Sequence, residues 1–213
     1  MSVSAKICGV STPEAVSAAL QGGAGFLGFV FFPKSPRNLA IDAARRLAEP
    51  VRNRARVVAL LVDPTDAQVD EVARGLAPDL IQLHGAESPA RVREIAGRAG
   101  TGIVKVLPVA EAADLAPAAD YETVAEHLMF DTKPPKDSPR PGGTGHSFDW
   151  TLMSGRRFRR PWFLAGGLDP WNLADAVQQS GAPMVDVSSG VERGPGLKDP
   201  ALITAFLDAA RRA

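Results

Sequence analysis

The chain has 213 residues, and its 24 Lys and Arg residues are balanced by 24 Asp and Glu residues. This balance gives no global electrostatic field that would favour nucleic acid or an anionic membrane surface as a partner. No apolar stretch approaches the roughly 18 residues that a membrane span needs, and Met1 leads almost directly into a strand with no signal-like segment. The single cysteine, Cys8, cannot form an internal disulfide. We therefore expect one domain over residues 1–213, located in the cytoplasm.

Short β-branched runs alternate with alanine-rich stretches along the whole chain. In chain order, strands are predicted over residues 3–8, 26–31, 57–62, 80–84, 103–107, 127–131, 162–165 and 184–188. Helices are predicted to begin near residues 12, 41, 66, 89, 110, 148, 170 and 199. Thr12 and Ser88 each place a capping hydroxyl before a first-turn proline, which is typical of a helix start.

Strict alternation of strands and helices implies parallel strands joined by right-handed crossovers. A closed barrel and an open doubly wound sheet both satisfy that pattern. No Gly-x-Gly-x-x-Gly motif follows the first strand, and the glycine-rich loops come late, after the sixth, seventh and eighth strands. Late phosphate loops are typical of the barrel, so we predict an α/β fold, a single-domain (β/α)8 TIM barrel.

Two glycine-rich loops follow the seventh and eighth predicted strands. The first contains Gly166 and Gly167, and the second contains Ser188, Ser189 and Gly190. Glycines let backbone N–H groups approach an anion closely, and a helix N-terminus adds a favourable partial charge. One such loop alone is equally well explained as a tight turn. Two loops in adjacent barrel positions favour a phosphate site, and the segment 142–145 is either a third wall of it or a hinge.

Cys8 and Asp131 each end a predicted strand, the first and the sixth, so both are expected at the same rim of the barrel. A thiolate can remove a proton, and a carboxyl shielded from water can donate one. A buried cysteine can equally be packing, and an aspartate after a strand can equally cap a loop. Taken alone, the two residues leave both interpretations open.

Arg37 lies in the loop after the second predicted strand, between residues that Pro33 and Pro36 make rigid. A guanidinium held in this way can bind a carboxylate through two parallel hydrogen bonds. Lys34 is a less planar candidate for the same task. The alternative for a loop arginine is a salt bridge on the surface.

Polar residues also alternate with apolar ones in two other predicted strands. His84 shares a strand face with Gln82, and Asp186 shares one with Ser188, so these side chains are expected to point to the centre of the barrel. Such residues can line a binding pocket, or they can satisfy a hydrogen bond within the core.

Together these motifs resemble phosphoribosylanthranilate isomerase, a family of barrel enzymes of tryptophan biosynthesis. The resemblance covers almost the whole chain, and its motifs follow in the order Lys6-Ile7-Cys8-Gly9, Gly28-Phe29-Val30-Phe31, Lys34-Ser35-Pro36-Arg37, Gln82-Leu83-His84-Gly85, Gly142-Gly143-Thr144-Gly145, Phe148-Asp149-Trp150, Leu164-Ala165-Gly166-Gly167-Leu168 and Asp186-Val187-Ser188-Ser189-Gly190-Val191-Glu192.

The resemblance implies an Amadori rearrangement of N-(5-phosphoribosyl)anthranilate to 1-(2-carboxyphenylamino)-1-deoxyribulose 5-phosphate. It implies that Asp131 is the general acid, that Cys8 is the general base, and that Arg37 holds the anthranilate carboxylate. His84 and Asp186 would line the pocket, and the two late glycine loops would hold the phosphate. No metal or organic cofactor is implied, because the substrate's own nitrogen is the electron sink.

The partner implied is this small-molecule substrate, with no nucleic acid and no membrane, and the chain is expected to be a monomer or a homodimer. Two alternatives remain at this point. One is a neighbouring phosphate-binding barrel, such as indole-glycerol-phosphate synthase or the tryptophan synthase α-subunit, and the other is a sugar-phosphate-binding barrel without turnover. The proline-rich segment 132–141 is longer than expected and has no assigned role.

Overall fold

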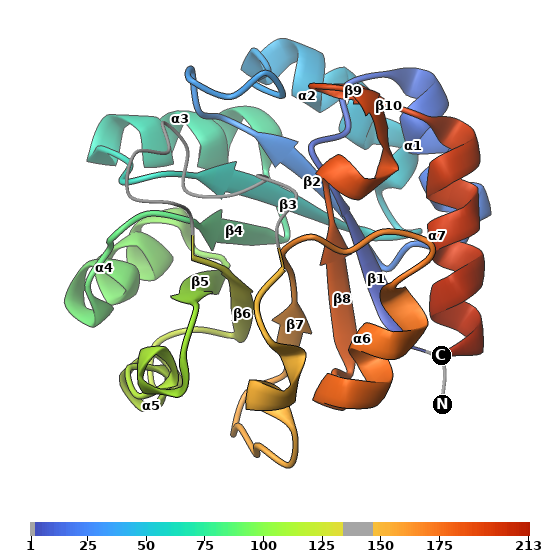
Figure 1. The fold of residues 1–213 in the computed structure, drawn as a ribbon. Coiled ribbons are helices and arrows are strands. Elements are labelled where there is room, and N and C mark those ends of the chain that lie inside the picture. The colour runs from blue at the N-terminus through green and yellow to red at the C-terminus, as the bar shows by residue number, and fades with distance from the viewer. Residues whose placement is uncertain (1–2, 134–146) are drawn as a thin grey trace.

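The computed structural model describes residues 3–133 and 147–213. In these ranges eight parallel strands form a closed barrel, which confirms the predicted (β/α)8 fold (Figure 1). The strands are β1 (Ser4–Cys8), β2 (Phe26–Val30), β3 (Arg56–Leu61), β4 (Leu80–Leu83), β5 (Gly102–Val109), β6 (His127–Thr132), β7 (Trp162–Leu164) and β8 (Met184–Val187). Pairing of β8 with β1 closes the barrel and sets Lys6 beside Asp186.

Helices surround the barrel: α1 (Pro13–Gln21), α2 (Ile41–Ala48), α3 (Asp66–Leu76), α4 (Pro89–Ala99), α5 (Ala118–Tyr121), α6 (Leu173–Ser180) and α7 (Pro200–Arg212). The predicted caps are confirmed, since the hydroxyl of Thr12 accepts from Ala15 N and that of Ser88 accepts from Arg91 N. Within residues 3–133 and 147–213, no helix combines the length and the apolar character needed to cross a bilayer.

Two predicted helices are wrong. After β5 the chain forms a 3-10 turn, η2 (Ala112–Leu115), and the four-residue α5, because Pro117 between them has no N–H to continue a helix. Near residue 148 there is only a 3-10 turn, η3 (Trp150–Met153), and the chain turns at Gly155 with a φ of 69°. The structure also adds a short hairpin after β8, formed by β9 (Glu192–Gly194) and β10 (Leu197–Lys198).

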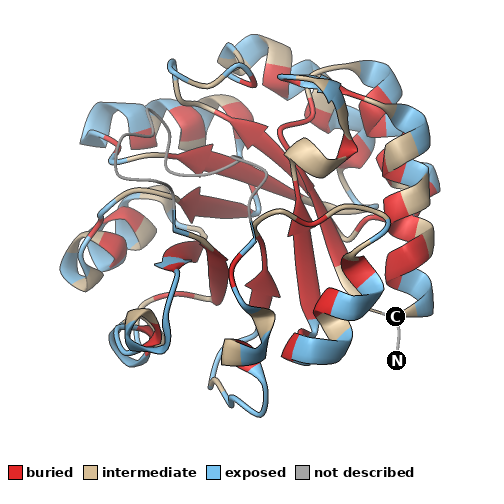
Figure 2. Cartoon of the chain, in the orientation of Figure 1, coloured by how far each residue is buried: buried red, intermediate tan, exposed pale blue. Residues whose placement is uncertain are grey.

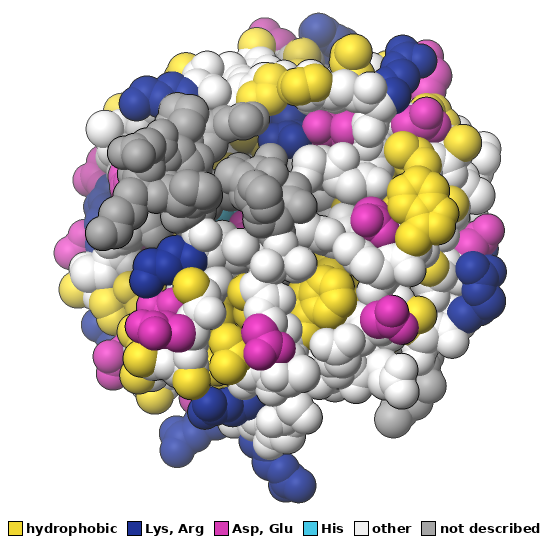
Figure 3. Space-filling view, in the orientation of Figure 1, with side chains coloured by type: hydrophobic (Ala, Val, Ile, Leu, Met, Phe, Trp, Pro, Cys, Tyr) yellow, Lys and Arg dark blue, Asp and Glu magenta, His cyan; other side chains and the backbone are white. Residues whose placement is uncertain are grey.

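The core has two layers because both faces of the barrel sheet are buried (Figure 2). One layer lies between strands and helices. The other fills the inside of the barrel with apolar side chains from alternate strand positions, namely Phe26, Val58, Leu80, Val104, Val106, Met129, Phe163, Ala165 and Met184. On the face drawn in Figure 3, positive and negative side chains are interspersed.

Charged side chains are the exceptions inside this molecule, and they are concentrated at the carboxyl ends of the strands. Lys6, Asp131 and Asp186 are buried inside the barrel, whereas Arg37 and Lys198 are buried in the loops that follow it. Burial of unpaired charge is costly, so each of these groups is expected to have a partner, and those partners define the candidate site.

Candidate active site

The predicted site residues on strands meet at one end of the barrel. Cys8 is the last residue of β1, Asp131 is one residue from the end of β6, and His84 follows β4 directly. Asp186 lies in β8, and Ser188 follows that strand. All eight strands run in parallel, so these ends share the rim where barrel enzymes carry their active sites.

Cys8 lies beside a buried ion pair. The Nζ atom of Lys6, two residues earlier on the same strand face, donates to Asp186 Oδ1 at 2.8 Å, and Lys6 is fully buried. Gly28 in the neighbouring strand leaves this place open, because a Cβ atom there would lie 3.0 Å from Lys6 Nζ and 3.1 Å from Cys8 Sγ. The ammonium of Lys6 is therefore placed to stabilise a thiolate at Cys8.

Burial and neighbouring charges act in opposite directions on the pKa values of Cys8 and Lys6. Burial raises the pKa of the Cys8 thiol above its ordinary value of 9.0, and Asp186 raises it further, while the positive charges of Lys6 and Lys198 lower it in part. Burial alone would lower the pKa of Lys6, but Asp186 and Cys8 outweigh it, so the pKa of Lys6 is raised and it stays charged. In the free protein Cys8 is thus mainly a thiol at neutral pH, with a cation beside it.

A titration of the single cysteine checks these directions. We expect the ultraviolet absorbance of the thiolate, measured as the difference from Cys8→Ala, to rise with a midpoint above pH 9.0. Lys6→Met should move that midpoint upward because it removes the nearby cation, and Asp186→Asn should move it downward because it removes the nearby anion. A midpoint that ignores both substitutions would contradict the described electrostatics.

Asp131 is held by two contacts at the end of β6. His84 Nε2 lies 3.1 Å from Asp131 Oδ2, and the backbone N–H of Thr132 donates to Asp131 Oδ1 at 2.8 Å. Gln82 Nε2 lies 3.4 Å from His84 Nδ1 and so fixes the other side of the imidazole. One carboxylate oxygen is thereby oriented by the backbone and the other by the imidazole of His84.

Close packing against Asp131 and Thr132 requires a glycine at position 166, which could not be predicted from the sequence. It has a φ of 89°, and a Cβ atom there would lie 2.8 Å from Asp131 Oδ1 and closer still to Thr132. Glycine is therefore required for the loop after β7 to approach the carboxylate of Asp131. Binding of phosphate by this glycine stays a prediction.

The two late glycine loops are in contact. A Cβ atom on Gly190 would lie 3.1 Å from Asp169 Cα and would overlap the carbonyl of Leu168, so the loop after β8 packs directly on the loop after β7. Ser188 uses its hydroxyl to donate to the carbonyl of Cys8 at 3.1 Å, and Ser189 begins a 3-10 turn, η4 (Ser189–Val191). The predicted glycine segment 142–145 lies outside the described residues, as does most of the proline-rich segment before it.

Arg37 is buried, so it is not part of a surface salt bridge. Its Nε donates to Glu192 Oε1 at 2.7 Å and its Nη2 donates to Glu192 Oε2 at 2.9 Å. Gly9 makes room for it, because a Cβ atom there would lie 2.5 Å from Arg37 Cδ. Glu192 also accepts from Lys198 Nζ at 2.7 Å. Neither Glu192 nor Lys198 has a role that the sequence pattern predicts.

A second buried ion pair supports the loop that follows His84. Lys105 Nζ, in β5, donates to Glu87 Oε2 at 2.6 Å and to the carbonyl of Gly85 at 2.7 Å. The other oxygen of Glu87 accepts from the backbone N–H groups of Asp63 at 2.9 Å and Gly85 at 3.1 Å. The Lys105–Glu87 pair thus joins the loop after β3, which contains Asp63, to the loop after β4, which contains Gly85 and begins at His84.

Loss of that support is expected to destabilise the protein. Lys105→Met should lower the free energy of unfolding by about 3 kcal/mol, because it leaves Glu87 buried without its cation. The comparison is made by urea denaturation against Lys133→Met, which removes a half-exposed lysine paired with Asp114 and should have little effect. Equal effects of the two substitutions would show that the buried pair is not a structural support.

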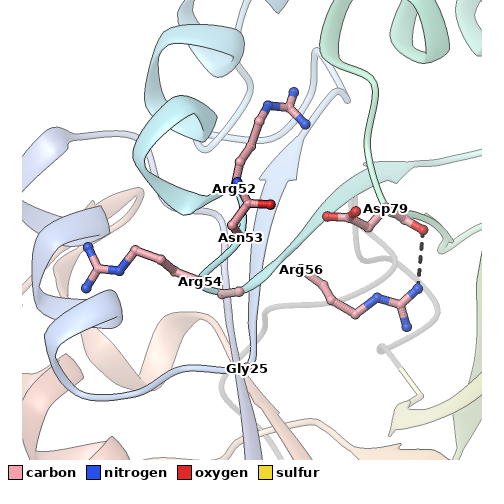
Figure 4. A pocket seen from close by; sticks show the side chains of 7 residues that line it. Gly25, Arg52, Asn53, Arg54, Arg56 and Asp79 are labelled. Carbon is pink, nitrogen blue, oxygen red and sulfur yellow. Dashed lines mark hydrogen bonds between the residues drawn. The ribbon is translucent and has the colours of Figure 1, made fainter.

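A separate pocket of about 520 Å³ lies at the opposite end of the barrel, where β2 and β3 begin (Figure 4). Three arginines line it, but their guanidinium groups point in different directions. Arg52 donates to the carbonyls of Leu76 and Ala77 at the end of α3, and Arg56 donates to Glu126. These groups serve the scaffold and do not converge on a ligand, so the rim with Cys8 and Asp131 is the better candidate site.

Comparisons with known proteins show the family of the chain. A family model described as N-(5'phosphoribosyl)anthranilate (PRA) isomerase matches residues 5–209. An N-(5'-phosphoribosyl)anthranilate isomerase of Caulobacter vibrioides is 62% identical over 217 residues, covering 100% of this chain and 99% of that protein. The crystal structure of the isomerase from Thermotoga maritima is 33% identical, with a TM-score of 0.88 over 99% of this chain and 100% of that one.

One solved relative carries a ligand. It is described as phosphoribosyl anthranilate isomerase in complex with reduced 1-(o-carboxyphenylamino)-1-deoxyribulose 5-phosphate, and it is 32% identical with a TM-score of 0.85, covering 99% of this chain and 100% of that one. A 3-hexulose-6-phosphate synthase is 16% identical with a TM-score of 0.62, covering 98% of this chain and 99% of that one, and it shares only the fold. The match over nearly the whole length shows that the chain belongs to the N-(5'-phosphoribosyl)anthranilate isomerase family.

Proposed function

We propose that this isomerase uses Asp131 as its general acid and Cys8 as its general base. The enzyme converts N-(5'-phosphoribosyl)anthranilate to 1-(2-carboxyphenylamino)-1-deoxyribulose 5-phosphate in tryptophan biosynthesis. The reaction rearranges one molecule into its isomer, so protons move between sites and no group is gained or lost. That chemistry calls for an acid and a base on the two sides of one sugar.

In the first step Asp131 gives its proton to the ribose ring oxygen. The bond between that oxygen and the first carbon breaks, and the nitrogen lone pair forms a Schiff base. In the second step the Cys8 thiolate removes the proton from the second carbon, which gives an enolamine that tautomerises to the ketone. The substrate's nitrogen accepts the electron pair, so the scheme uses no cofactor.

The observation that carries this assignment is the pairing of each proton carrier with a second ionisable side chain. Cys8 has the ammonium of Lys6 beside it, and His84 Nε2 lies 3.1 Å from Asp131 Oδ2. Lys6 favours the thiolate that a base requires, and His84 can stabilise the carboxylate that remains after proton donation. A fluorescence assay that follows loss of phosphoribosylanthranilate, run beside Cys8→Ala, tests the assignment.

The substrate has two anionic ends, and the site offers an anchor for each. We assign the phosphate to the two touching loops, at Gly166, Gly167, Ser188, Ser189 and Gly190, because glycine-rich turns let backbone N–H groups approach an anion, and the hydroxyl of Ser188 links this region to Cys8. We assign the anthranilate carboxylate to Arg37, and the lining of the pocket between the anchors to His84 and Asp186. The protein is thus proposed to hold the sugar by both ends, between the acid and the base.

Arg37→Ala is expected to weaken substrate binding more than catalysis. Loss of one charge-assisted contact costs about 1 to 3 kcal/mol, so KM should rise about fivefold to 150-fold with a smaller change in kcat. Steady-state kinetics give both values. If kcat falls and KM does not change, the carboxylate anchor lies elsewhere.

A small-molecule substrate is the partner that the liganded relative supports. We propose a monomer or a homodimer, since one solved relative is described as monomers generated from the dimeric enzyme of Thermotoga maritima. We also propose a cytoplasmic location, because the one cysteine has no second cysteine to pair with. Light scattering on the purified protein decides the oligomeric state.

A further inference from the structure

Arg37, Glu192 and Lys198 form a buried charged group beside the proposed substrate site. The exposed fractions of their side chains are 7%, 4% and 0%. Arg37 comes from the loop after β2, whereas Glu192 and Lys198 face each other across the β9–β10 hairpin. Two cations and one carboxylate give this group a net charge of +1, an unusual surplus for buried side chains.

The geometry of Arg37 leaves one edge of its guanidinium for another carboxylate. Glu192 takes the edge made by Nε and Nη2, at 2.7 Å and 2.9 Å. Among residues 3–133 and 147–213, no hydrogen-bond acceptor contacts Nη1, so the outer edge made by Nη1 and Nη2 can still bind a carboxylate bidentately. Glu192 therefore orients the guanidinium of Arg37 and leaves the edge made by Nη1 and Nη2 for a ligand.

Without Lys198, this arrangement would be poorly suited to an anionic ligand. Arg37 and Glu192 alone form a neutral pair, and a carboxylate on the outer edge would face the negative charge of Glu192 across a single guanidinium. Lys198 Nζ donates to Glu192 Oε1 at 2.7 Å, and Gly196 N donates to Oε2 at 3.2 Å. Glu192 is thereby neutralised by a cation that does not touch the outer edge of Arg37.

We propose that Lys198 is a positioning residue that supplies the positive charge needed for Arg37 to bind the anthranilate carboxylate while it stays paired with Glu192. This inference rests on the proposed role of Arg37. It adds a residue that acts through Glu192 on the specificity of the site for a carboxylate at the aromatic end of the substrate.

Lys198 has a second set of contacts that gives a competing role. Its Nζ also donates to the carbonyl of Ser188 at 2.7 Å and contacts the hydroxyl of Ser188 at 3.2 Å. If those contacts were its main purpose, loss of Lys198 would disturb the phosphate loop, and it would weaken every phosphorylated ligand equally. The two roles can therefore be distinguished by comparing the affinity for a phosphorylated ligand that has the carboxylate with the affinity for one that lacks it.

The experiment measures the ratio of these affinities by calorimetry with two probes. The first is reduced 1-(o-carboxyphenylamino)-1-deoxyribulose 5-phosphate, and the second is the same compound without its carboxyl group. We expect Lys198→Met to reduce the preference for the carboxylated probe about tenfold or more, because the positive charge that neutralises Glu192 behind Arg37 is lost, while the second probe binds almost as before. Lys198→Arg keeps the charge and should restore most of the preference.

Arg37→Ala, measured in parallel, separates failure of this inference from failure of the proposed function. Loss of the preference in Arg37→Ala but not in Lys198→Met would overturn the role of Lys198 and leave the anchor intact. An unchanged preference in Arg37→Ala would overturn the anchor itself. Equal weakening of both probes by Lys198→Met would assign Lys198 to the phosphate loop and would also overturn the proposal.

A pH series with the native lysine gives a test that needs no folded Lys198→Met. Burial lowers the pKa of Lys198 to about 8, although Glu192 raises it in part, and Arg37 and Cys8 are the other charged or titratable groups that act on it. Lys198 loses its charge as pH rises through that value, so the preference for the carboxylated probe should fall above about pH 8. Measurement in Cys8→Ala removes thiol ionisation, and the preference should stay constant with Lys198→Arg; a constant preference with lysine would contradict the proposal.

Discussion

Cys8→Ala is expected to lower kcat by about 10³-fold while the dissociation constant of the reduced product analogue changes by no more than a few-fold. General acid–base catalysis by a placed side chain contributes about 10² to 10⁴ in rate, and alanine removes the whole proton acceptor. Binding survives because the proposed anchors, Arg37 and the two glycine loops, come from other segments of the chain. Single-turnover fluorescence and calorimetry measure the two quantities separately.

Cys8→Ser is the matched control for this substitution. Serine keeps nearly the same volume in the buried position at the end of β1, but its hydroxyl does not ionise at the pH of the assay. It should therefore be as inactive as alanine while being folded as well as the native protein. An active serine variant, or an equal loss of binding and turnover in Cys8→Ala, would show that the thiol has a structural role.

Asp131→Asn is expected to reduce kcat to a similar degree, about 10³-fold. The amide keeps the shape of the carboxyl, and its oxygen can still accept from the N–H of Thr132, but it has no proton to give to the ribose oxygen. Ring opening should then become the slow step, and the product analogue should still bind.

The control for charge removal is Asp42→Asn, since the Asp42 side chain on α2 is 74% exposed and forms its ion pair with Arg45 of the same helix. That variant should turn over at the native rate. A native rate in Asp131→Asn as well would remove this carboxyl from the mechanism.

The positions of Cys8, Asp131 and Asp186 could be predicted because each lies at or near the end of a strand. In a parallel barrel the strand end and the alternation of side chains fix both the rim and the face on which a residue lies. The same alternation of side chains predicts a shared face for Gln82 and His84, and their contact at 3.4 Å agrees with it.

Glu192, Lys198 and Lys105 could not be assigned in this way. Lys198 reaches Glu192 through the β9–β10 hairpin, and that hairpin has no long alternating pattern from which its pairing could be predicted. Lys105 lies on the outward face of β5, where the pattern predicts apolar packing, and only the fold brings Glu87 to it. Local periodicity encodes neither the pairing in this short hairpin nor the contact between Lys105 and Glu87.

The helices after β5 and β6 were mispredicted for a related reason. Alanine-rich composition around residue 112 favours a helix, but Pro117 has no N–H to continue one, so the chain forms two separate short turns. The helix propensity of alanine correctly indicated a helical conformation, and Pro117 limited the length of each helical turn.

The proposed catalysis requires one arrangement, a sugar held between a sulfur and a carboxyl. A crystal structure of the protein with reduced 1-(o-carboxyphenylamino)-1-deoxyribulose 5-phosphate measures it directly. We predict Cys8 Sγ within about 4 Å of the second carbon and a carboxylate oxygen of Asp131 within about 3.5 Å of the former ring oxygen, on opposite sides of the chain of carbons. A ligand that contacts only one of these groups, or both groups on the same side of it, would contradict the account.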